Sequence, residues 1–171
     1  PHAAPVVVLT ETADLAWPVE PESEIAGPLS GTISSLAQVA SASEWTIEEI
    51  AGHKMRLRSA VSNNATDRRS PDEIVDAVAA AASEGARLAV DAGAHMFSAM
   101  SRWPAHAPHD VLKSNGLSTM GFAVPAALAS WLQEPDRPTV ALTGDGGMMM
   151  SLAELSTAAR MGANLTVVVL N

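Results

Sequence analysis

One carboxylate stands among three glycines at Gly144-Asp145-Gly146-Gly147, directly after the apolar run PTVALT. Glycine permits a sharp turn and lets a ligand approach the backbone closely. The free amides at the start of a following helix suit an anionic phosphate. A carboxylate would repel that phosphate unless a divalent cation lay between them, and Mg²⁺ binds carboxylate and phosphate oxygens together. The pattern therefore indicates either a phosphate and magnesium site or a tight turn in which Asp145 caps a helix.

Two common phosphate-binding motifs do not fit this stretch. The dinucleotide fingerprint Gly-x-Gly-x-x-Gly would need glycine at position 149, where the chain has Met149. A P-loop would need Gly-Lys-Ser or Gly-Lys-Thr, and neither follows. The choice between site and turn therefore depends on the longer pattern.

The elements around this stretch alternate between helix and strand over residues 70–171. Ser70-Pro71-Asp72-Glu73 predicts a capped helix start, and Gly85 is expected to stop that helix. Strands are expected at 87–93, 138–143 and 165–171, with a mixed loop and helix region at 97–112. Helices are expected near Pro125 and from about Met149 to Met161. The strands are continuously apolar, which is typical of a doubly wound, mostly parallel α/β sheet with helices on both faces.

Three of these strand ends carry polar or glycine-rich residues. They are Asp91-Ala92-Gly93, Gly144 to Gly147, and Asn171. Ligands of such sheets bind beyond the carboxyl ends of the strands. The three ends are therefore expected to converge on one site, with Asp91 in a turn or hydrogen-bonding role.

The N-terminal part of the chain gives weaker signals. Residues 5–10 predict a strand, Glu11 to Pro28 a loop, and 29–41 and 46–61 helices. The polar stretch 62–69 is the expected linker. The resulting organisation is a remnant of another domain or a linker at 1–45, a connecting helix and linker at 46–69, and a binding domain at 70–171. Both ends of the chain are expected to be cut, which makes the fold incomplete at both ends.

Composition narrows the classes of function. The chain has 171 residues, is 47% hydrophobic and carries a formal net charge of −9, so a nucleic acid or an anionic membrane is not an expected partner. The absence of cysteine excludes disulfides and a cysteine nucleophile and fits a cytoplasmic protein. No apolar run approaches the roughly 20 residues of a membrane span, and the stretch PHAAPVVVLT, which lacks a basic region before its apolar residues, is not expected to be a secretory signal.

The longer stretch GDGGMMMSLAELSTAARMGANLTVVVLN resembles the cofactor motif of thiamine-diphosphate-dependent enzymes. In that motif, some two dozen residues separate Gly-Asp-Gly from an asparagine; here the 24 residues 147–170 separate Gly146 from Asn171. Upstream, GLSTMGFAVPAALA resembles the family's GLGxMGxxxPAAxGA segment, and VDAGAHMFSA resembles the GQHQ segment of acetolactate synthases. The resemblance covers about residues 70–171 and implies the diphosphate-binding domain of the acetolactate synthase-like branch.

The resemblance assigns roles to individual residues. Asp145 would bind Mg²⁺, Gly146 and Gly147 would hold the diphosphate, and Met120 would support the bent cofactor between its two rings. His95 would lie near the diphosphate. A second metal ligand is expected immediately beyond Asn171. The cofactor-binding residues that the resemblance implies are His95, Ser118, Thr119, Met120, Gly144, Asp145, Gly146, Gly147 and Asn171.

Two positions depart from the family pattern. Ser118, which would contact the aminopyrimidine through its backbone, stands where glycine is usual in acetolactate synthases. Ala94 replaces the glutamine that precedes the histidine of the GQHQ segment. These changes affect the expected identity with acetolactate synthase more than the expected binding of the cofactor.

Several other residues are expected to be structural. Met148, Met149 and Met150 are expected to pack at the start of a helix, and Glu154 lies inside that helix. His106, His109 and Asp110 resemble a metal cluster, but a solvated loop is the preferred interpretation.

The function implied is thiamine-diphosphate- and Mg²⁺-dependent decarboxylation and/or carboligation of 2-keto acids. The activating glutamate of the family lies on another domain, so no catalytic residue is assigned here and these residues alone are expected to be inactive. FAD binding is left open, and a homodimer or homotetramer is expected. The alternatives are a non-catalytic homologue with the same fold and an unrelated phosphate-binding α/β domain.

Overall fold

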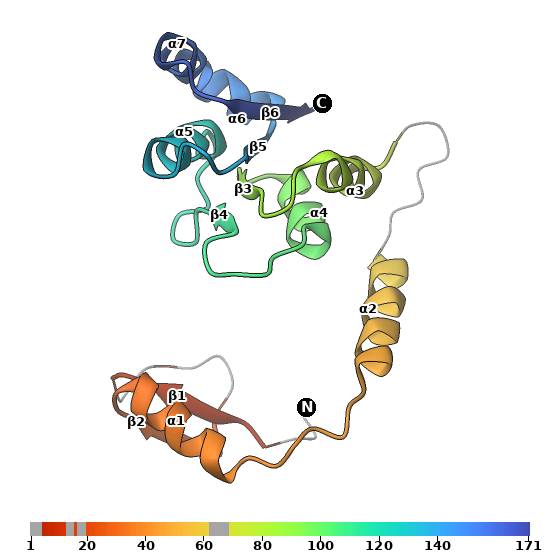
Figure 1. Cartoon of the computed structure of the whole chain (residues 1–171), viewed down its shortest axis with the longest axis vertical. Helices are drawn as coiled ribbons and strands as arrows, with labels where there is room; N and C mark the ends of the chain where they lie inside the picture. The colour runs from red at the N-terminus through yellow and green to blue at the C-terminus, as the bar shows by residue number, and fades with distance from the viewer. Residues whose placement is uncertain (1–4, 13–15, 17–19, 62–68) are drawn as a thin grey trace. The chain divides into compact units, whose positions relative to one another are not determined.

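The structure, a computed structural model, describes residues 5–12, 16, 20–61 and 69–171 (Figure 1). It divides into two compact units, Pro1–Ala51 and Gly52–Asn171, each of which is described by itself. The division falls within α2 (Ile47–Val61). The presence of α2 confirms the helix expected at 46–61. Most of the expected linker, 62–68, lies outside the described residues. The boundaries expected near residues 45 and 69 stay predictions.

The first unit contains a small parallel sheet and one helix. β1 (Val7–Thr10) pairs with β2 (Ser23–Ala26), and α1 (Leu29–Val39) follows. The strand expected at 5–10 and the helix expected at 29–41 are confirmed. The loop expected from Glu11 to Pro28 is wrong in part, because it contains β2. This strand has four exposed residues and one large apolar side chain, Ile25, so it shows no period that the sequence could reveal.

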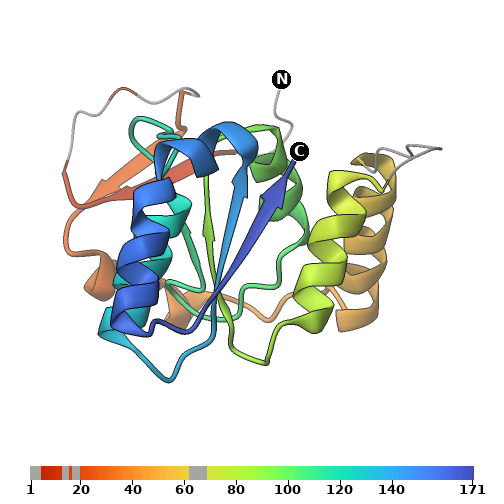
Figure 2. The ribbon, with the colours of Figure 1, turned by 90° about the horizontal axis from the view of Figure 1, so that it is seen from above.

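The second unit is built on four parallel strands in the order β4-β3-β5-β6. Figure 2 shows α3 on one side of this sheet and α5 and α7 on the other. The expected α/β fold with helices on both faces is therefore confirmed. Its strands are β3 (Arg87–Val90), β4 (Val111–Lys113), β5 (Thr139–Gly144) and β6 (Leu165–Leu170). Its helices after α2 are α3 (Pro71–Ala81), α4 (Ala94–Arg102), α5 (Ala123–Gln133), α6 (Asp145–Met150) and α7 (Leu152–Met161).

The capping box expected at the start of α3 is present. The Ser70 hydroxyl accepts from the Glu73 amide at 3.2 Å, and the Glu73 carboxylate accepts from the Ser70 amide at 2.7 Å. The expected stop at Gly85 is wrong, because α3 already ends at Ala81. Gly85 instead takes a left-handed φ of 76° in the turn that enters β3, a conformation that suits glycine.

Three other boundaries differ from the sequence prediction. The region 97–112 was expected to mix loop and helix, but α4 begins at Ala94 and β4 follows at Val111. The helix expected from about Met149 to Met161 is confirmed as α7, but a separate short helix, α6, begins before it at Asp145, so the glycine-rich stretch is itself the first turn of α6. Glycine disfavours a helix on propensity alone. Burial of Gly147 and Met148 outweighs that preference.

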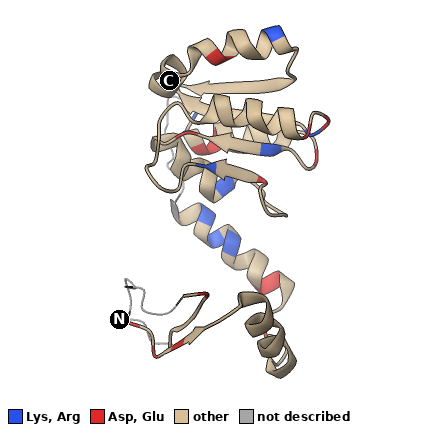
Figure 3. Ribbon diagram, turned by 90° about the vertical axis from the view of Figure 1, so that its left-hand side faces the viewer, with Lys and Arg blue, Asp and Glu red and all other residues tan. Residues whose placement is uncertain are grey.

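Charged residues are sparse on the strands and helices of the second unit. In the part of the chain that Figure 3 colours, most of the ribbon carries neither sign, and basic residues gather on α2, which contains Lys54, Arg56 and Arg58. Among the residues described, none of the helices combines the length and the apolar character that crossing a bilayer requires.

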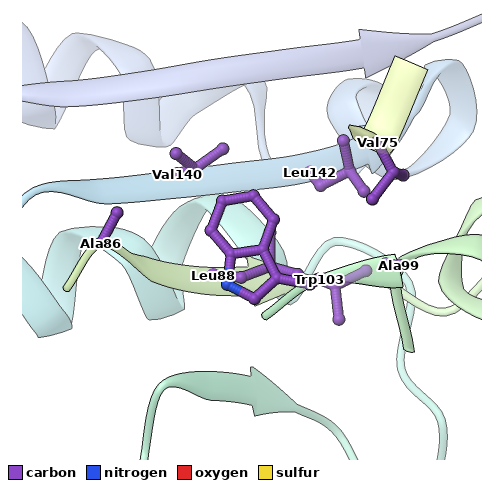
Figure 4. Packing of buried hydrophobic residues seen from close by; sticks show 8 residues of the cluster. Val75, Ala86, Leu88, Ala99, Trp103, Val140 and Leu142 are labelled. Carbon is purple, nitrogen blue, oxygen red and sulfur yellow. The ribbon is translucent and has the colours of Figure 1, made fainter. Parts of the chain in front are cut away.

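The two faces of the sheet pack differently. On the face of α3 and α4, large side chains meet in one cluster, in which Trp103 and Val75 cover Leu88, Val140 and Leu142 (Figure 4). On the opposite face the buried contacts of β3, β5 and α5 are mostly alanines: Ala89, Ala141, Ala123 and Ala127. Small side chains let α5 approach the strands closely. Tight packing of this kind tolerates little added volume.

The amino-terminal edge of this sheet is fixed by paired charges. Buried Arg87 donates to Ser130 and Glu134, each at 2.8 Å. Asp110 accepts from the amides of His106 and Ala107, both at 2.7 Å, and pairs with Arg137 at 2.5 Å. These amide hydrogen bonds, with the Arg137 guanidinium, lower the pKa of Asp110 to about 2. The Asp110 carboxylate therefore stabilises the loop before β4 by binding two of its amides and Arg137.

We predict that Asp110→Asn reduces the acid sensitivity of the fold. The pKa of Asp110 in the folded chain, about 2, lies below its ordinary value of 3.8. Its stabilising contribution is therefore complete above pH 3.8 and is lost as the pH falls toward about 2. Melting temperatures of the two chains measured between these pH values should differ less as the pH falls. A constant difference across the window would contradict the assignment. Asp136→Asn, an exposed change nearby, is the control.

Candidate functional site

The order in which the parallel strands are added to the sheet reverses between β3 and β5. From β3 it passes through α4 to β4 on one side, and β5 and β6 lie on the other side. The carboxyl ends of β3 and β5 therefore border a crevice, which is where ligands bind in open α/β sheets. Asp91 directly follows β3, Gly144 ends β5, and Asn171 follows β6. The topology thus places the three polar strand ends at one edge, as the sequence predicts.

The Asp91 side chain connects the segments at this edge. It is fully buried, and its Oδ1 accepts from the Ala123 amide at 2.6 Å. Its Oδ2 accepts from the Gly121 amide at 3.0 Å and from the Thr143 hydroxyl at 2.6 Å. One carboxyl group therefore joins β3 to the start of α5 and to the end of β5. The hydrogen-bonding role expected for Asp91 is confirmed, and it extends further than a local turn.

The glycines of α6 leave no room for side chains. A Cβ on Gly147 would overlap Asp91 Oδ2 and lie 2.6 Å from Thr143 Oγ1. A Cβ on Gly146 would lie 3.1 Å from the terminal methyl of Met120. Gly147 is therefore fixed by close packing, whereas the flexible Met120 side chain could move away from a Cβ on Gly146. Both glycines line the cavity at this edge. Such a bare backbone can be approached closely by a phosphate.

His95 lies against the same backbone. It is the second residue of α4 rather than part of a loop, and only 7% of it is exposed. Its ring packs on Gly93 and Gly144: a Cβ on Gly93 would lie 2.6 Å from His95 Cε1, and one on Gly144 would lie 3.4 Å from the same atom. Burial lowers the pKa of His95, although the Asp91 charge and a hydrogen bond to the Asp91 backbone act in the opposite direction. The imidazole is therefore neutral at pH 7.

One polar atom of this group is unsatisfied. His95 Nε2 is buried and has no hydrogen-bond partner in the part of the chain that the structure describes. A buried polar atom without a partner is costly and calls for an explanation. A ligand held against His95 is one source of the missing partner.

A cavity of about 440 Å³ opens over these residues. It is lined by seven of the residues predicted for the cofactor: His95, Met120, Gly144, Asp145, Gly146, Gly147 and Asn171. Further lining residues come from α3 and the residue before its cap, from the loop after β3 with the first residue of α4, and from the end of β6: Arg69, Pro71, Ile74, Ala92, Gly93, Ala94 and Leu170.

The two remaining predicted residues are not in the described lining of this cavity. The Ser118 backbone has a left-handed φ of 48°, and the Thr119 hydroxyl lies 3.1 Å from that of Ser114. Glycine adopts the left-handed region without strain, which explains why the family pattern has glycine at the position of Ser118. Serine takes the same conformation here at some cost in strain. The roles assigned to Ser118 and Thr119 stay predictions.

The methionines next to the glycines divide into two groups. Met148 is buried and packs against α5, as expected. Met149 and Met150 are 70% and 68% exposed, so the expectation that all three pack at the start of a helix is wrong for these two. A six-residue helix at the edge of the unit can bury only one side. None of the three is in the described lining of the cavity, whereas Met120 is.

Asp145 is the residue at this edge that could bind a metal. It is exposed at the start of α6 and lines the cavity. Within residues 5–12, 16, 20–61 and 69–171, no three His, Asp or Glu side chains gather into a group that could hold a metal ion. A metal ion held by Asp145 would therefore need other ligands as well, and Mg²⁺ commonly takes phosphate oxygens and water in such a position.

Two residues important to the geometry had weak signals in the sequence. Asp91 is visible as a polar residue at a strand end, but its three donors come from residues 30 to 52 positions away. Thr143 has the appearance of an ordinary β-branched strand residue. Only the pairing of β3 with β5 brings its hydroxyl to Asp91.

We predict that Gly147→Ala disrupts this edge. The added methyl would overlap Asp91 and approach Thr143 too closely, and overpacking of this kind costs about 1–3 kcal/mol. The free energy of unfolding, measured with urea, should fall by that amount. Gly116→Ala is the matched control, because a Cβ there meets nothing within 4 Å. Equal stability of the two variants would contradict the packing described.

We predict that Asp91→Ala is among the most destabilising single substitutions of this unit. It would leave two amides and one hydroxyl without their acceptor, and a buried unsatisfied group costs about 1–3 kcal/mol. Amide exchange at Gly121 and Ala123 should accelerate together, and urea unfolding should measure a loss of about 3 kcal/mol or more. Asp76 provides the control, because its side chain is 46% exposed and its partner Arg102 also pairs with Asp72. Asp76→Ala should cost under about 1 kcal/mol, and a similar loss in both would count against the role of Asp91.

Comparison with known proteins shows that the chain is similar to acetolactate synthases. The chain is 28% identical over 174 residues to the acetolactate synthase isozyme 1 large subunit of Escherichia coli, an alignment that covers 100% of this chain and 31% of the relative. It is 38% identical over 101 residues to the acetolactate synthase large subunit of Haemophilus influenzae, with 59% and 18% covered. It is 26% identical over 165 residues to the acetolactate synthase of Bacillus subtilis, with 93% and 29% covered. The chain thus spans less than a third of the length of these relatives.

A family match coincides with the edge described above. Residues 91–171 match the family described as thiamine pyrophosphate enzyme, C-terminal TPP binding domain. The matched range begins at Asp91 and ends at Asn171, and so contains the glycines of α6 and the loop of Met120. Residues 91–171 of this chain therefore belong to the thiamine pyrophosphate enzymes, as their C-terminal TPP-binding domain.

Proposed function

We propose that this chain supplies the diphosphate-binding half of the active site of a thiamine-diphosphate- and Mg²⁺-dependent enzyme. The reaction is decarboxylation and/or carboligation of 2-keto acids, by analogy with the acetolactate synthases to which the chain is similar. The observation that carries the proposal is the cavity at the carboxyl edge, where seven residues predicted for the cofactor meet.

The residues of the cavity fit a diphosphate and a divalent cation. Gly146 and Gly147 present backbone without side chains, and the close packing of Gly147 on Asp91 and Thr143 holds that backbone in place. Asp145 offers a carboxylate at the same point and would hold Mg²⁺ between itself and the phosphates. Asn171 adds an amide at the end of the next strand. The donor set is therefore of the oxygen-rich kind that Mg²⁺ prefers.

Two further residues would orient the cofactor. Met120 reaches the surface of the cavity next to Gly146, where its flexible thioether can support an apolar ring. Neutral His95 can donate or accept one hydrogen bond without adding charge near the phosphates. The bound cofactor would supply the nucleophilic carbon and the electron sink of the reaction. The protein would supply position, metal binding and exclusion of water from the crevice.

The rest of the active site would come from other parts of the enzyme. The activating glutamate that the family resemblance implies has no assigned position in this chain, so we expect the 171 residues alone to be inactive toward 2-keto acids. We also propose that the complete enzyme is a homodimer or homotetramer.

The decisive test is binding of thiamine diphosphate to the chain by isothermal titration calorimetry. Binding should require Mg²⁺, and Asp145→Ala should weaken it by at least tenfold, because removing the carboxylate removes a ligand of the metal. Asp136→Ala, which removes an exposed carboxylate at the opposite edge of the sheet, should leave binding unchanged.

Other outcomes distinguish the alternatives. Binding of ATP or NAD in preference to thiamine diphosphate would indicate an unrelated phosphate-binding α/β domain. Normal binding by a full-length protein that converts no 2-keto acid would indicate a non-catalytic homologue. Binding of thiamine diphosphate that is independent of both Mg²⁺ and Asp145 would refute the metal assignment alone.

A further inference from the structure

Arg69 is the one permanently cationic residue among the described residues that line the cofactor cavity. Asp145 is the other charged residue of that lining, and His95 is neutral because burial lowers its pKa. A cavity that contains only Asp145 would repel an anion. Arg69 therefore changes the electrostatic character of the cavity in a chain whose net charge is −9.

The backbone next to Arg69 is held firmly. Ser70, the next residue, is buried and forms the capping box with Glu73, and Pro71 restricts the backbone further. Arg69 itself is exposed and precedes this fixed cap. Its side chain is thus anchored at the border of the cavity, although it is free to extend toward a ligand.

Arg69 has no protein partner, in contrast to three other arginines of this unit. Arg87, Arg102 and Arg137 each pair with a carboxylate at 3.0 Å or less. Across residues 5–12, 16, 20–61 and 69–171, the guanidinium of Arg69 forms neither an ion pair nor a hydrogen bond. A second cavity, at the amino-terminal edge, contains Arg137, but that arginine is already paired with Asp110 and Glu134. Of these four arginines, the one without a partner is therefore the one at the cofactor cavity.

We infer that Arg69 recognises an oxyanion in this cavity, either the terminal phosphate of the cofactor or the carboxylate of the 2-keto acid. The inference rests on the proposed function and adds a residue that the family resemblance does not assign. The planar guanidinium binds phosphate and carboxylate through two parallel hydrogen bonds, which a lysine cannot do. Arg69 would thereby offset the repulsion between Asp145 and an anionic ligand.

The test compares Arg69→Gln and Arg69→Lys with the parent chain. Arg160→Gln is the matched control, since it removes the same charge from an exposed position on α7 outside the described lining of the cavity. The probes are thiamine diphosphate and thiamine monophosphate with Mg²⁺, measured by calorimetry, and pyruvate with cofactor present, measured by saturation-transfer NMR. Unchanged circular dichroism and melting temperature would exclude a folding defect.

The outcomes separate the two sources of the oxyanion. If Arg69 binds the terminal phosphate, Arg69→Gln should weaken thiamine diphosphate about tenfold and thiamine monophosphate much less, with Arg69→Lys between. If it binds the substrate carboxylate, only the pyruvate signal should fall. In either case the dependence of affinity on salt should be shallower in Arg69→Gln than in Arg160→Gln, because one charge contact is lost.

Two results would overturn the inference. If all probes bind Arg69→Gln as they bind the parent chain, the role of Arg69 is refuted, while the Asp145-dependent binding of thiamine diphosphate stands. If the parent chain binds neither the thiamine phosphates nor pyruvate, both this inference and the proposed function fail.

Discussion

The buried carboxyl group of Asp91 is the interaction on which the crevice depends. It accepts three hydrogen bonds, from two amides at the start of α5 and from the Thr143 hydroxyl on β5. Burial of a carboxyl group is unfavourable unless hydrogen bonds compensate for lost water. Here the compensating donors lie on the segments that border the crevice. The same hydrogen bonds that satisfy the buried Asp91 carboxyl group therefore also bring those segments together. Gly147 then packs directly on the same carboxyl group.

The charged side chains at the two edges of the sheet differ in whether they form ion pairs. At the amino-terminal edge, Arg87 and Arg137 are paired with Glu134 and Asp110. At the carboxyl edge, neither Arg69 nor Asp145 has an ion pair with any residue that the structure describes. Paired charges stabilise loops, whereas unpaired charges beside a cavity remain available to a ligand. This contrast, together with the unsatisfied His95 Nε2, distinguishes the carboxyl edge as the binding edge.

The family assignment and the geometry support each other without being the same argument. The family match covers residues 91–171. The cavity also includes Arg69, Pro71 and Ile74, from the cap and first turns of α3, which lie before that range. Those residues belong to the unit by packing, since Val75 on α3 covers the strands of the same sheet (Figure 4). The cavity therefore has a wall that the family match does not include.

Much of this architecture follows from the sequence alone. Apolar strand runs, the Ser70 capping box and glycine-rich strand ends determine the α/β class and the carboxyl-edge location of the candidate site, because these signals are local and carry their own physical cause. Tertiary structure decided the rest. β2 and β4 are too short to show a period, and α6 forms in a glycine-rich segment because Met148 and Gly147 are buried. The partners of Asp91 required the fold, and so did the presence of Arg69 and Asp145 in the lining of one cavity, because in both cases the residues lie far apart in the chain.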